Sequence, residues 1–415
     1  MKKKLKFEQK FPKLKREEKR RFFIFRKKRK EEEIENIKSI IKNKKIKNLS
    51  STLNLKKAKI QKRFLKKAKK GAEEILEKSK DYWNKSEEEK IDRPNASEVK
   101  KAAEVFKKIR AEVAKIVIGQ EGVIEGLIRA VLCDGHVLLE GVPGIAKTLA
   151  IRALAAASGC ESKRIQFTVD LLPSDIVGIT TYTPNKGFEI IKGPIFANFI
   201  IGDEVNRSPP KTQSALLESM QERQVTIGKS TFPLPKPFFV MATENPLEVS
   251  GVYSLPEAQI DRFLFKLIMS YPGKEAEIKI MEQNVNTRRF DDFKIKKISS
   301  PKEIIAMQEL VHEIYMSDEI KEYIVRIVLA TRDKSATKYS KYIEWGASPR
   351  ASIGFFIAAK AQALMSGRNF VLPQDIKDVA KPVLRHRVIL NYEAQADNIS
   401  ADKVIESILN KIKTP

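Results

Sequence analysis

Gly141-Val142-Pro143-Gly144-Ile145-Ala146-Lys147-Thr148 is the stretch of sequence that decides the fold. The apolar run His136 to Glu140 precedes it, and the Ala-rich stretch Leu149 to Ala157 follows it. A strand, a Gly-rich turn and a helix in this order are the context of a phosphate-binding loop. Backbone N–H groups and the helix N-terminus would hold the phosphates, Lys147 would reach the β and γ oxygens, and the Thr148 hydroxyl would ligate Mg²⁺.

The octet and the adjoining Leu149 therefore predict a nucleotide site. Gly-rich turns before helices also occur without a ligand, and Ala146 stands where the strict pattern has Gly. The octet alone leaves both readings open.

Two further apolar runs end in polar residues. Phe199 to Gly202 is followed by Asp203-Glu204, and Phe238 to Ala242 by Thr243-Glu244-Asn245. Runs that are apolar throughout are typical of strands in a parallel sheet covered on both faces. The carboxyl ends of such strands share one edge, where open α/β sheets bind ligands. We therefore expect the loop, the acidic pair and Asn245 to meet at that edge.

Each of these polar residues has a role available to it in ATP hydrolysis. Asp203 would hold Mg²⁺ through water, and Glu204 would orient and deprotonate the water that attacks the γ-phosphate. Asn245 would hydrogen-bond that water or the γ-phosphate. An isolated acidic pair more often just ends a strand in solvent, and a lone Asn before Pro246 is an ordinary turn residue. Their order along the chain favours catalysis.

The chain divides into three predicted parts. Residues 1–96 form a Lys-rich extension that is partly helical, around residues 56–80, or disordered. Residues 97–271 form an α/β domain, which opens with a helix capped at Ser97 and contains a hairpin over 181–191. Residues 272–415 form an all-α domain, with helices around 304–315, 320–330 and 352–365.

The positive charge belongs almost entirely to the extension. The whole chain carries +26, whereas residues 1–100 contain 36 basic and 16 acidic residues, which is +20. Arguments for nucleic-acid or anionic-membrane binding therefore apply to residues 1–95 alone, where aromatics and basic residues mix between Arg20 and Lys30. The alternative, which we favour, is a solvated Lys-rich extension.

The remaining composition indicates a cytoplasmic protein. Cys133 and Cys160 are the two cysteines, too few for a disulfide framework. No run approaches the length of a signal-peptide core or a membrane span. The three histidines, at 136, 312 and 386, show no metal-ligand spacing and are interpreted as structural.

The ordered runs of the chain resemble the MoxR family of AAA+ ATPases, over roughly residues 98–395. The runs that carry the resemblance are LEGVPG at 139–144, RIQFT at 164–168, DLLPSD at 170–175, GPIFAN at 193–198, DEVNR at 203–207, PKTQSALLE at 210–218, QERQVT at 221–226, LPEAQIDRF at 255–263 and SPRAS at 348–352. Ala in place of the loop Gly is a variant that this family commonly shows.

The resemblance implies roles for residues whose chemistry is ambiguous by itself. Arg262 resembles the arginine finger that reaches a neighbouring subunit's site, although Arg207 or Arg223 would also suit that role. Arg350 resembles the sensor-2 arginine of the helical lid, which contacts the γ-phosphate within the same subunit. Gly119 and Gln120 fall where relatives bind the adenine base. The hairpin resembles the helix-2 insert of this clade, which faces the pore or the client.

The resemblance also implies the activity. The expected protein is a Mg²⁺-dependent ATPase that forms a hexameric ring and remodels a client protein, such as one with a von Willebrand A domain encoded nearby. One alternative is a chelatase-type motor subunit for metal insertion. The other is an ATPase tethered to nucleic acid or membrane through residues 1–95.

Overall fold

The fold was determined as a computed structural model. It describes residues 94–184, 187–246, 252–283 and 289–415. The predicted helix over 56–80 and the basic cluster at 20–30 lie outside the described residues. Residues 90–415 form one unit by their internal contacts.

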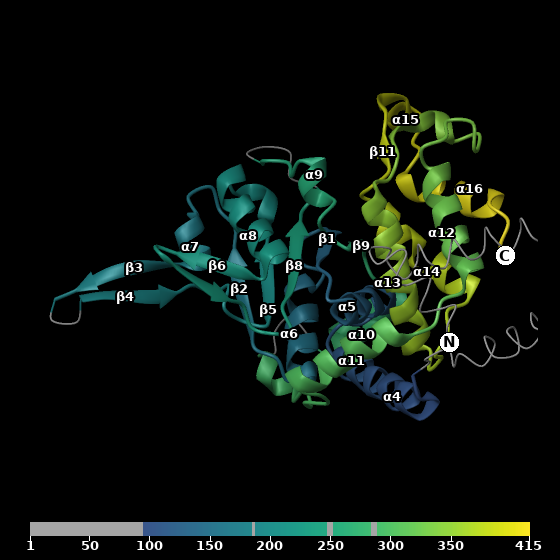
Figure 1. The fold of residues 1–415 in the computed structure, drawn as a ribbon. Coiled ribbons are helices and arrows are strands. Elements are labelled where there is room, and N and C mark those ends of the chain that lie inside the picture. The colour runs from purple at the N-terminus through teal and green to yellow at the C-terminus, as the bar shows by residue number, and fades with distance from the viewer. Residues whose placement is uncertain (1–93, 185–186, 247–251, 284–288) are drawn as a thin grey trace, which may run out of the picture. The chain divides into compact units, whose positions relative to one another are not determined.

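Five parallel strands form the central sheet (Figure 1). The apolar runs predict three of them, at 136–140, 199–202 and 238–242. The five strands are β1 (Val137–Gly141), β2 (Ser162–Gln166), β5 (Phe199–Asp203), β8 (Phe239–Glu244) and β9 (Phe265–Met269). Their order in the sheet is β2-β5-β8-β1-β9. Since all five run in one direction, the loop after β1 and the polar ends of β5 and β8 share one edge.

Alternate residues of the central strands β1, β5 and β8 enter two different hydrophobic cores. Val137, Leu139 and Phe239 face α4 (Ala96–Val113), α5 (Glu121–Leu132) and α6 (Lys147–Ser158). Leu138 and Val240 face α7 (Pro173–Val177), α8 (Pro210–Glu222) and α9 (Glu257–Ile260). Coverage of both faces explains why the central strands are apolar at every position.

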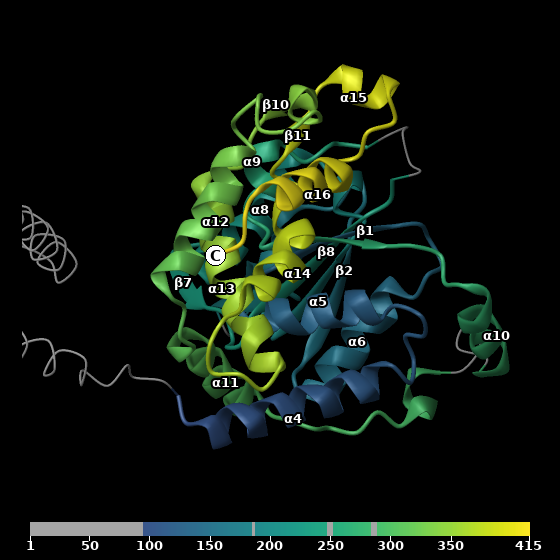
Figure 2. The ribbon, with the colours of Figure 1, turned by 90° about the vertical axis from the view of Figure 1, so that its right-hand side faces the viewer.

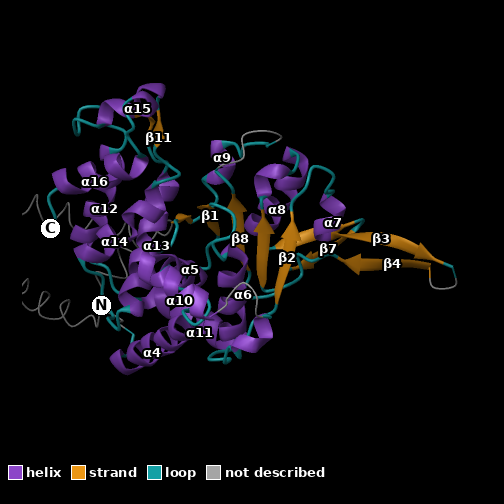
Figure 3. Ribbon diagram, turned by 180° about the vertical axis from the view of Figure 1, so that it is seen from behind, coloured by secondary structure: helices purple, strands orange, loops and turns teal. Residues whose placement is uncertain are grey.

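Two antiparallel hairpins extend from this core. The first pairs β3 (Gly178–Thr183) with β4 (Gly187–Lys192), at the predicted place, and projects away from the sheet (Figure 3). The second pairs β6 (Gln224–Ile227) with β7 (Ser230–Pro233). On the first hairpin, the Tyr182 side chain is 64% exposed and that of Phe188 is 80% exposed. No core covers this aromatic pair.

The C-terminal part is helical, as predicted. Its helices are α10 (Lys274–Gln283), α11 (Pro301–Glu313), α12 (Asp318–Ala330), α13 (Pro349–Met365), α14 (Pro373–Leu384), α15 (Tyr392–Ala396) and α16 (Ala401–Lys411). Strands β10 (Ile343–Trp345) and β11 (Ile389–Leu390) form a small antiparallel pair, and single 3₁₀ turns lie at Val205–Arg207, Phe290–Phe293 and Ser340–Tyr342. Helix α13 packs on α4 and α5, and α14 packs on β9.

The first helix starts two residues earlier than expected. Asn95, rather than Ser97, occupies the cap position, and its side-chain Oδ1 accepts a hydrogen bond from Ser97 N at 3.0 Å. Asn is as good a cap as Ser, and Pro94, which has no backbone N–H, precedes the cap outside the helix. Among the described residues no helix is long and apolar enough to cross a membrane.

Candidate functional site

The loop after β1 has the backbone that a phosphate-binding loop needs. A Cβ atom on Gly141 would lie 2.8 Å from Ile145 Cδ1 and 2.9 Å from the Met269 carbonyl oxygen, so a side chain there has no room. Ala146 has φ of 69°, in the left-handed region, directly before α6. Glycine is the usual residue in this conformation, and Ala adopts it at a cost of about 1 kcal/mol.

Lys147 begins α6 and is buried beneath the loop. Its Nζ donates to the Gly141 carbonyl oxygen at 2.6 Å and lies 3.5 Å from the carbonyl oxygen of Glu244, at the end of β8. The ammonium group therefore lies between the ends of β1 and β8. This is where the sequence pattern predicts contact with the phosphates.

Asp203 is the last residue of β5, and its carboxylate accepts hydrogen bonds from side chains of α6, β2 and β8. Its Oδ2 accepts from Thr148 Oγ1 at 3.2 Å and from Arg164 Nη2 at 2.7 Å, and its Oδ1 accepts from Thr243 Oγ1 at 2.7 Å. Burial raises the pKa of this carboxyl group, but the hydrogen bonds and the Arg164 charge outweigh it and hold the pKa below its usual value. The group is thus an anion beside the Thr148 hydroxyl.

Glu204 is held in a strained backbone conformation, with φ of 58°. Its N–H donates to Thr243 Oγ1 at 2.9 Å, and its Oε2 accepts from Gln166 Nε2 at 2.8 Å. Arg207 Nε lies 3.1 Å from the same oxygen. Asn245 is buried one residue beyond β8. The predicted polar residues therefore meet at one edge of the sheet.

These groups fit a magnesium nucleotide. Carboxylate and hydroxyl oxygens are the ligands that Mg²⁺ prefers, and Asp203 and Thr148 present both beside the N-terminus of α6. No cluster of three or more His, Cys, Asp or Glu that would form an all-protein metal site occurs among the described residues. A metal here would need oxygens from the nucleotide as well.

A cavity of about 300 Å³ adjoins the loop on its other side. Its wall is mainly apolar, and Pro143 to Ala146 form part of it together with Ile116, Val117, Ile118, Gln120, Tyr271, Pro272, Glu277, Ile280 and Met281. Gln120 Nε2 donates to the Ser270 carbonyl oxygen at 2.7 Å. At Gly119, with φ of 72°, a Cβ would lie 2.6 Å from Ala276 Cβ. The size and apolar wall of this cavity are those of a small-ligand site.

Comparisons with known proteins agree with this geometry. Residues 136–265 match the model of the ATPase family associated with various cellular activities, and residues 335–408 match the AAA lid domain. The chain is 46% identical over 320 residues to Chaperone MoxR1 of Mycobacterium tuberculosis, which covers 76% of this chain and 84% of that protein. This chain belongs to the MoxR family of AAA+ ATPases.

Two further relatives extend the comparison. Protein MoxR of Methylorubrum extorquens is 29% identical, over 73% of this chain and 93% of that protein. A crystal structure from Cytophaga hutchinsonii, described as a candidate ATPase, is 45% identical with a TM-score of 0.71, over 77% of this chain and 98% of that chain. The MoxR relationship thus covers the sheet and the helical lid, and leaves out most of the N-terminal extension.

Arg350 of this MoxR-family chain lies at the edge of the sheet opposite its own loop. Its Nη1 is 3.6 Å from Asp261 Oδ2, and Leu264 N, three residues further on, donates to the His136 carbonyl oxygen at the start of β1. The five residues of β1 separate the two edges by roughly 15 Å. Arg350 therefore lies away from the loop of its own chain.

Arg262 shares that opposite edge. Its side chain is exposed, and it makes no hydrogen bond or ion pair within the described part of the chain. Figure 2 shows α9, which precedes it, far from α10 at the nucleotide cavity. Arg223, by contrast, donates to the Phe238 carbonyl oxygen at 2.6 Å and pairs with Asp134 at 3.1 Å. Arg207 contacts its own Glu204.

Arg387 is a residue that sequence reasoning missed. It is buried after α14, its Nε donates to Asp261 Oδ1 at 2.8 Å, and its Nη2 donates to the Phe263 carbonyl oxygen at 2.7 Å. It therefore ties the lid to the segment that carries Arg262. Arg164, Gln166 and Thr243 were also missed as site residues, although 164–168 was recognised as a family run.

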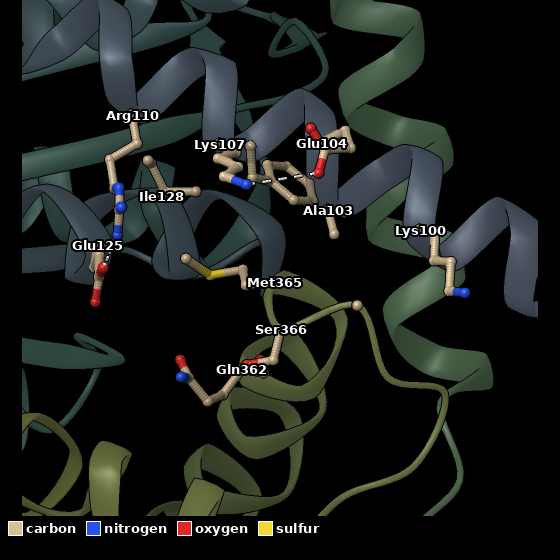
Figure 4. A pocket seen from close by; sticks show the side chains of 12 residues that line it. Lys100, Ala103, Glu104, Lys107, Arg110, Glu125, Ile128, Gln362, Met365 and Ser366 are labelled. Carbon is tan, nitrogen blue, oxygen red and sulfur yellow. Dashed lines mark hydrogen bonds and ion pairs between the residues drawn. The ribbon is translucent and has the colours of Figure 1, made fainter.

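A second cavity, of about 630 Å³, lies away from the loop, between α4, α5 and the end of α13 (Figure 4). Four of its charged side chains form two ion pairs, Lys107 with Glu104 at 3.8 Å and Arg110 with Glu125. Phe106, Ile128 and Met365 line the rest. The cavity lies beside the contact of α13 with α4 and α5.

Proposed function

We propose that this MoxR-family ATPase binds ATP with Mg²⁺ and hydrolyses it to ADP and phosphate in a ring, with which it remodels a client protein. The observation that carries the proposal is the meeting of Lys147, Thr148, Asp203 and Glu204 at one sheet edge. Membership of the family supports hydrolysis and action on partner proteins. A hexameric ring and a client with a von Willebrand A domain are part of the proposal.

The residues at the carboxyl ends of β1, β5 and β8 have different roles in this proposal. The loop N–H groups and the Lys147 ammonium hold the β- and γ-phosphates, and Thr148 and Asp203 hold Mg²⁺, which would neutralise phosphate charge when bound. Glu204 accepts the proton of the attacking water, and Asn245 helps to orient that water or the γ-phosphate. The base cavity at Gly119 and Gln120 takes the adenine.

Arg262 and Arg350 act on the nucleotide of a neighbouring subunit. Their distance from the chain's own loop and the exposure of the Arg262 side chain support this assignment. A guanidinium that enters from the next subunit neutralises charge on the γ-phosphate in the transition state. Arg207 and Arg223 are less suited as fingers, because contacts within their own chain already engage both.

Two substitutions in the full-length protein test the proposed chemistry. Lys147→Ala should abolish ATP binding, measured with a fluorescent nucleotide. Glu204→Gln should bind ATP with affinity close to that of the unmodified chain and release phosphate at least 100-fold more slowly, since it keeps the shape but loses the base. Undiminished phosphate release by the Glu204→Gln variant would sink the mechanism.

The same Glu204→Gln variant tests remodelling. A ring held in its ATP state should retain its client, so a pull-down in ATP should recover ring and client together. Recovery of the client equally well in ADP, or with Lys147→Ala, would separate client binding from the nucleotide and contradict an ATP-driven cycle.

A further inference from the structure

Arg164 holds the carboxylate oxygen that faces the proposed metal site. Its Nε donates to Asp203 Oδ2 at 3.0 Å and its Nη2 donates to the same oxygen at 2.7 Å. That oxygen also accepts the hydrogen bond of Thr148, the other proposed metal ligand. Two N–H groups and one hydroxyl therefore already use the lone pairs that a cation at this place would need.

The strand register explains why Arg164 reaches this oxygen. In the pairing of β2 with β5, Arg164 lies opposite Ile201 and Gln166 opposite Asp203. Alternate residues of one strand share a sheet face, and so do residues paired across neighbouring strands. Arg164, Gln166 and Asp203 therefore lie on one face, whereas Lys163 lies on the other. Arg164 also donates to Gln166 Oε1, and Gln166 donates to Glu204. The guanidinium is thus linked to both acids.

The Arg164 side chain contributes little to the core. It is 52% exposed, and its strand is the edge strand of the sheet. Its contribution to stability is to pair the buried Asp203 carboxylate, because a buried charge without a partner is costly. The carboxylate that it neutralises is only 10% exposed in its side chain. Because the Arg164 side chain is half exposed, its guanidinium can move into solvent when it leaves Asp203.

We propose that Arg164 is a resident cation that keeps bare divalent metal off Asp203 and so makes metal binding depend on the nucleotide. A divalent ion alone would meet the guanidinium charge and would gain only two protein oxygens. ATP adds phosphate oxygens and negative charge at the same place. These favour binding of the metal over the contact of the guanidinium with Asp203. The guanidinium then leaves Asp203 Oδ2 for solvent or phosphate.

This inference rests on the proposed function, since it assumes that Thr148 and Asp203 bind the metal. Its direct readout is metal binding without nucleotide. Titration of the full-length protein with Mn²⁺, followed by the electron paramagnetic resonance signal of the free ion, measures that affinity. Arg164→Met removes the charge but keeps an unbranched side chain. It should lower the Mn²⁺ dissociation constant at least tenfold relative to the unmodified chain.

Three controls assign the change to the charge at Asp203. Arg164→Lys, which keeps a cation, should bind Mn²⁺ as weakly as the unmodified chain. Lys163→Met removes the same charge from the same strand on the opposite face, where Lys163 pairs with Glu161 at 3.3 Å, and should change nothing. Adding Asp203→Asn to Arg164→Met should abolish the gained site.

The outcomes separate this inference from the proposed function. Mn²⁺ binding by Arg164→Met no tighter than in the unmodified chain, in a protein with an unchanged melting temperature, overturns the role of Arg164 alone. Equal tightening in Arg164→Lys or Lys163→Met overturns it as well. If the unmodified chain fails to bind ATP with Mg²⁺, the proposed function itself fails, and the inference with it.

Discussion

Thr243 connects the two acidic residues of the site. Its hydroxyl donates to Asp203 Oδ1 and accepts from the N–H of Glu204, and its side chain is fully buried. One hydroxyl therefore fixes the carboxylate of one acid and the strained backbone of the other. Nothing in the sequence distinguishes this Thr from any other residue at a strand end, because the role depends on the pairing of β5 with β8.

His136 is structural, as the absence of ligand spacing suggests, and it makes stability depend on pH. Its Nδ1 accepts from Val240 N at 3.1 Å, so the neutral ring carries its proton on Nε2, which donates to the Met220 carbonyl oxygen at 3.1 Å. Burial, with a smaller effect of the Arg223 charge, lowers the pKa of this imidazole to about 3. Protonation of Nδ1 would place its N–H against the N–H of Val240, so that this hydrogen bond would be lost.

The pKa of His136 predicts acid destabilisation. The unfolded chain takes up a proton below pH of about 6.5, and the folded chain does so only near pH 3, so stability falls as the pH drops through this window. Between pH 7 and 5 the loss is about 2 kcal/mol from this residue. Urea unfolding at both pH values should show that loss in the unmodified chain relative to His136→Asn. Parallel pH dependence in the two proteins would refute it.

The β3–β4 hairpin carries an exposed aromatic pair that does not pack into either hydrophobic core. The rings of Tyr182 and Phe188 contact edge to face at 5.4 Å between centroids, on a hairpin that projects from the sheet. Exposed aromatic side chains of this kind are common at sites that bind other proteins. The hairpin therefore suits client contact.

Replacing Tyr182 and Phe188 by Ser should separate client binding from hydrolysis. We expect ATP turnover within twofold of the unmodified chain, because neither residue contacts the loop edge, and at least tenfold weaker capture of the client that the Glu204→Gln variant traps. Tyr392→Ser, at an 87% exposed residue of α15, is the matched control and should leave capture unchanged. Loss of capture in the control as well would point to a general surface effect.

At the scale of the whole molecule, the assignment of the arginines predicts complementation between subunits. Lys147→Ala lacks a working loop but keeps Arg262, whereas Arg262→Ala keeps the loop but lacks the finger. Each protein alone should be inactive. In an equal mixture roughly a quarter of the subunit boundaries pair an intact loop with an intact arginine, so phosphate release should return. A mixture as inactive as its components would mean that Arg262 does not act between subunits.

The basic extension is predicted to be separable from the ATPase. Deletion of residues 1–93 keeps Pro94 and the Asn95 cap of α4, so the melting temperature and ATP turnover should stay close to those of the full chain. Binding of both proteins to poly(U) RNA and to phosphatidylserine vesicles, at low and high salt, tests the tether alternative. A large loss of turnover on deletion would contradict separability.

Sequence patterns predict the three central strands, the hairpin, three helices of the lid and the strand, loop and helix of the phosphate-binding octet. Central strands that are covered on both faces are apolar throughout, and the loop octet has fixed spacing, so both leave a local signal. The edge strand β2 has no such local signal, because only Ile165 of its five residues is buried. Family resemblance pointed to that run, but not to what its side chains do.

Only the tertiary structure decided which residues share a site. Arg164, Gln166 and Thr243 meet the acids because β2, β5 and β8 pair in a particular register, and Arg387 meets Asp261 because the lid packs on β9. The position of Arg350 beside Asp261 follows from the same packing, and the proposed role between subunits depends on it. Local sequence encodes strands and turns, whereas contacts between residues far apart in the chain depend on register and on how the layers pack.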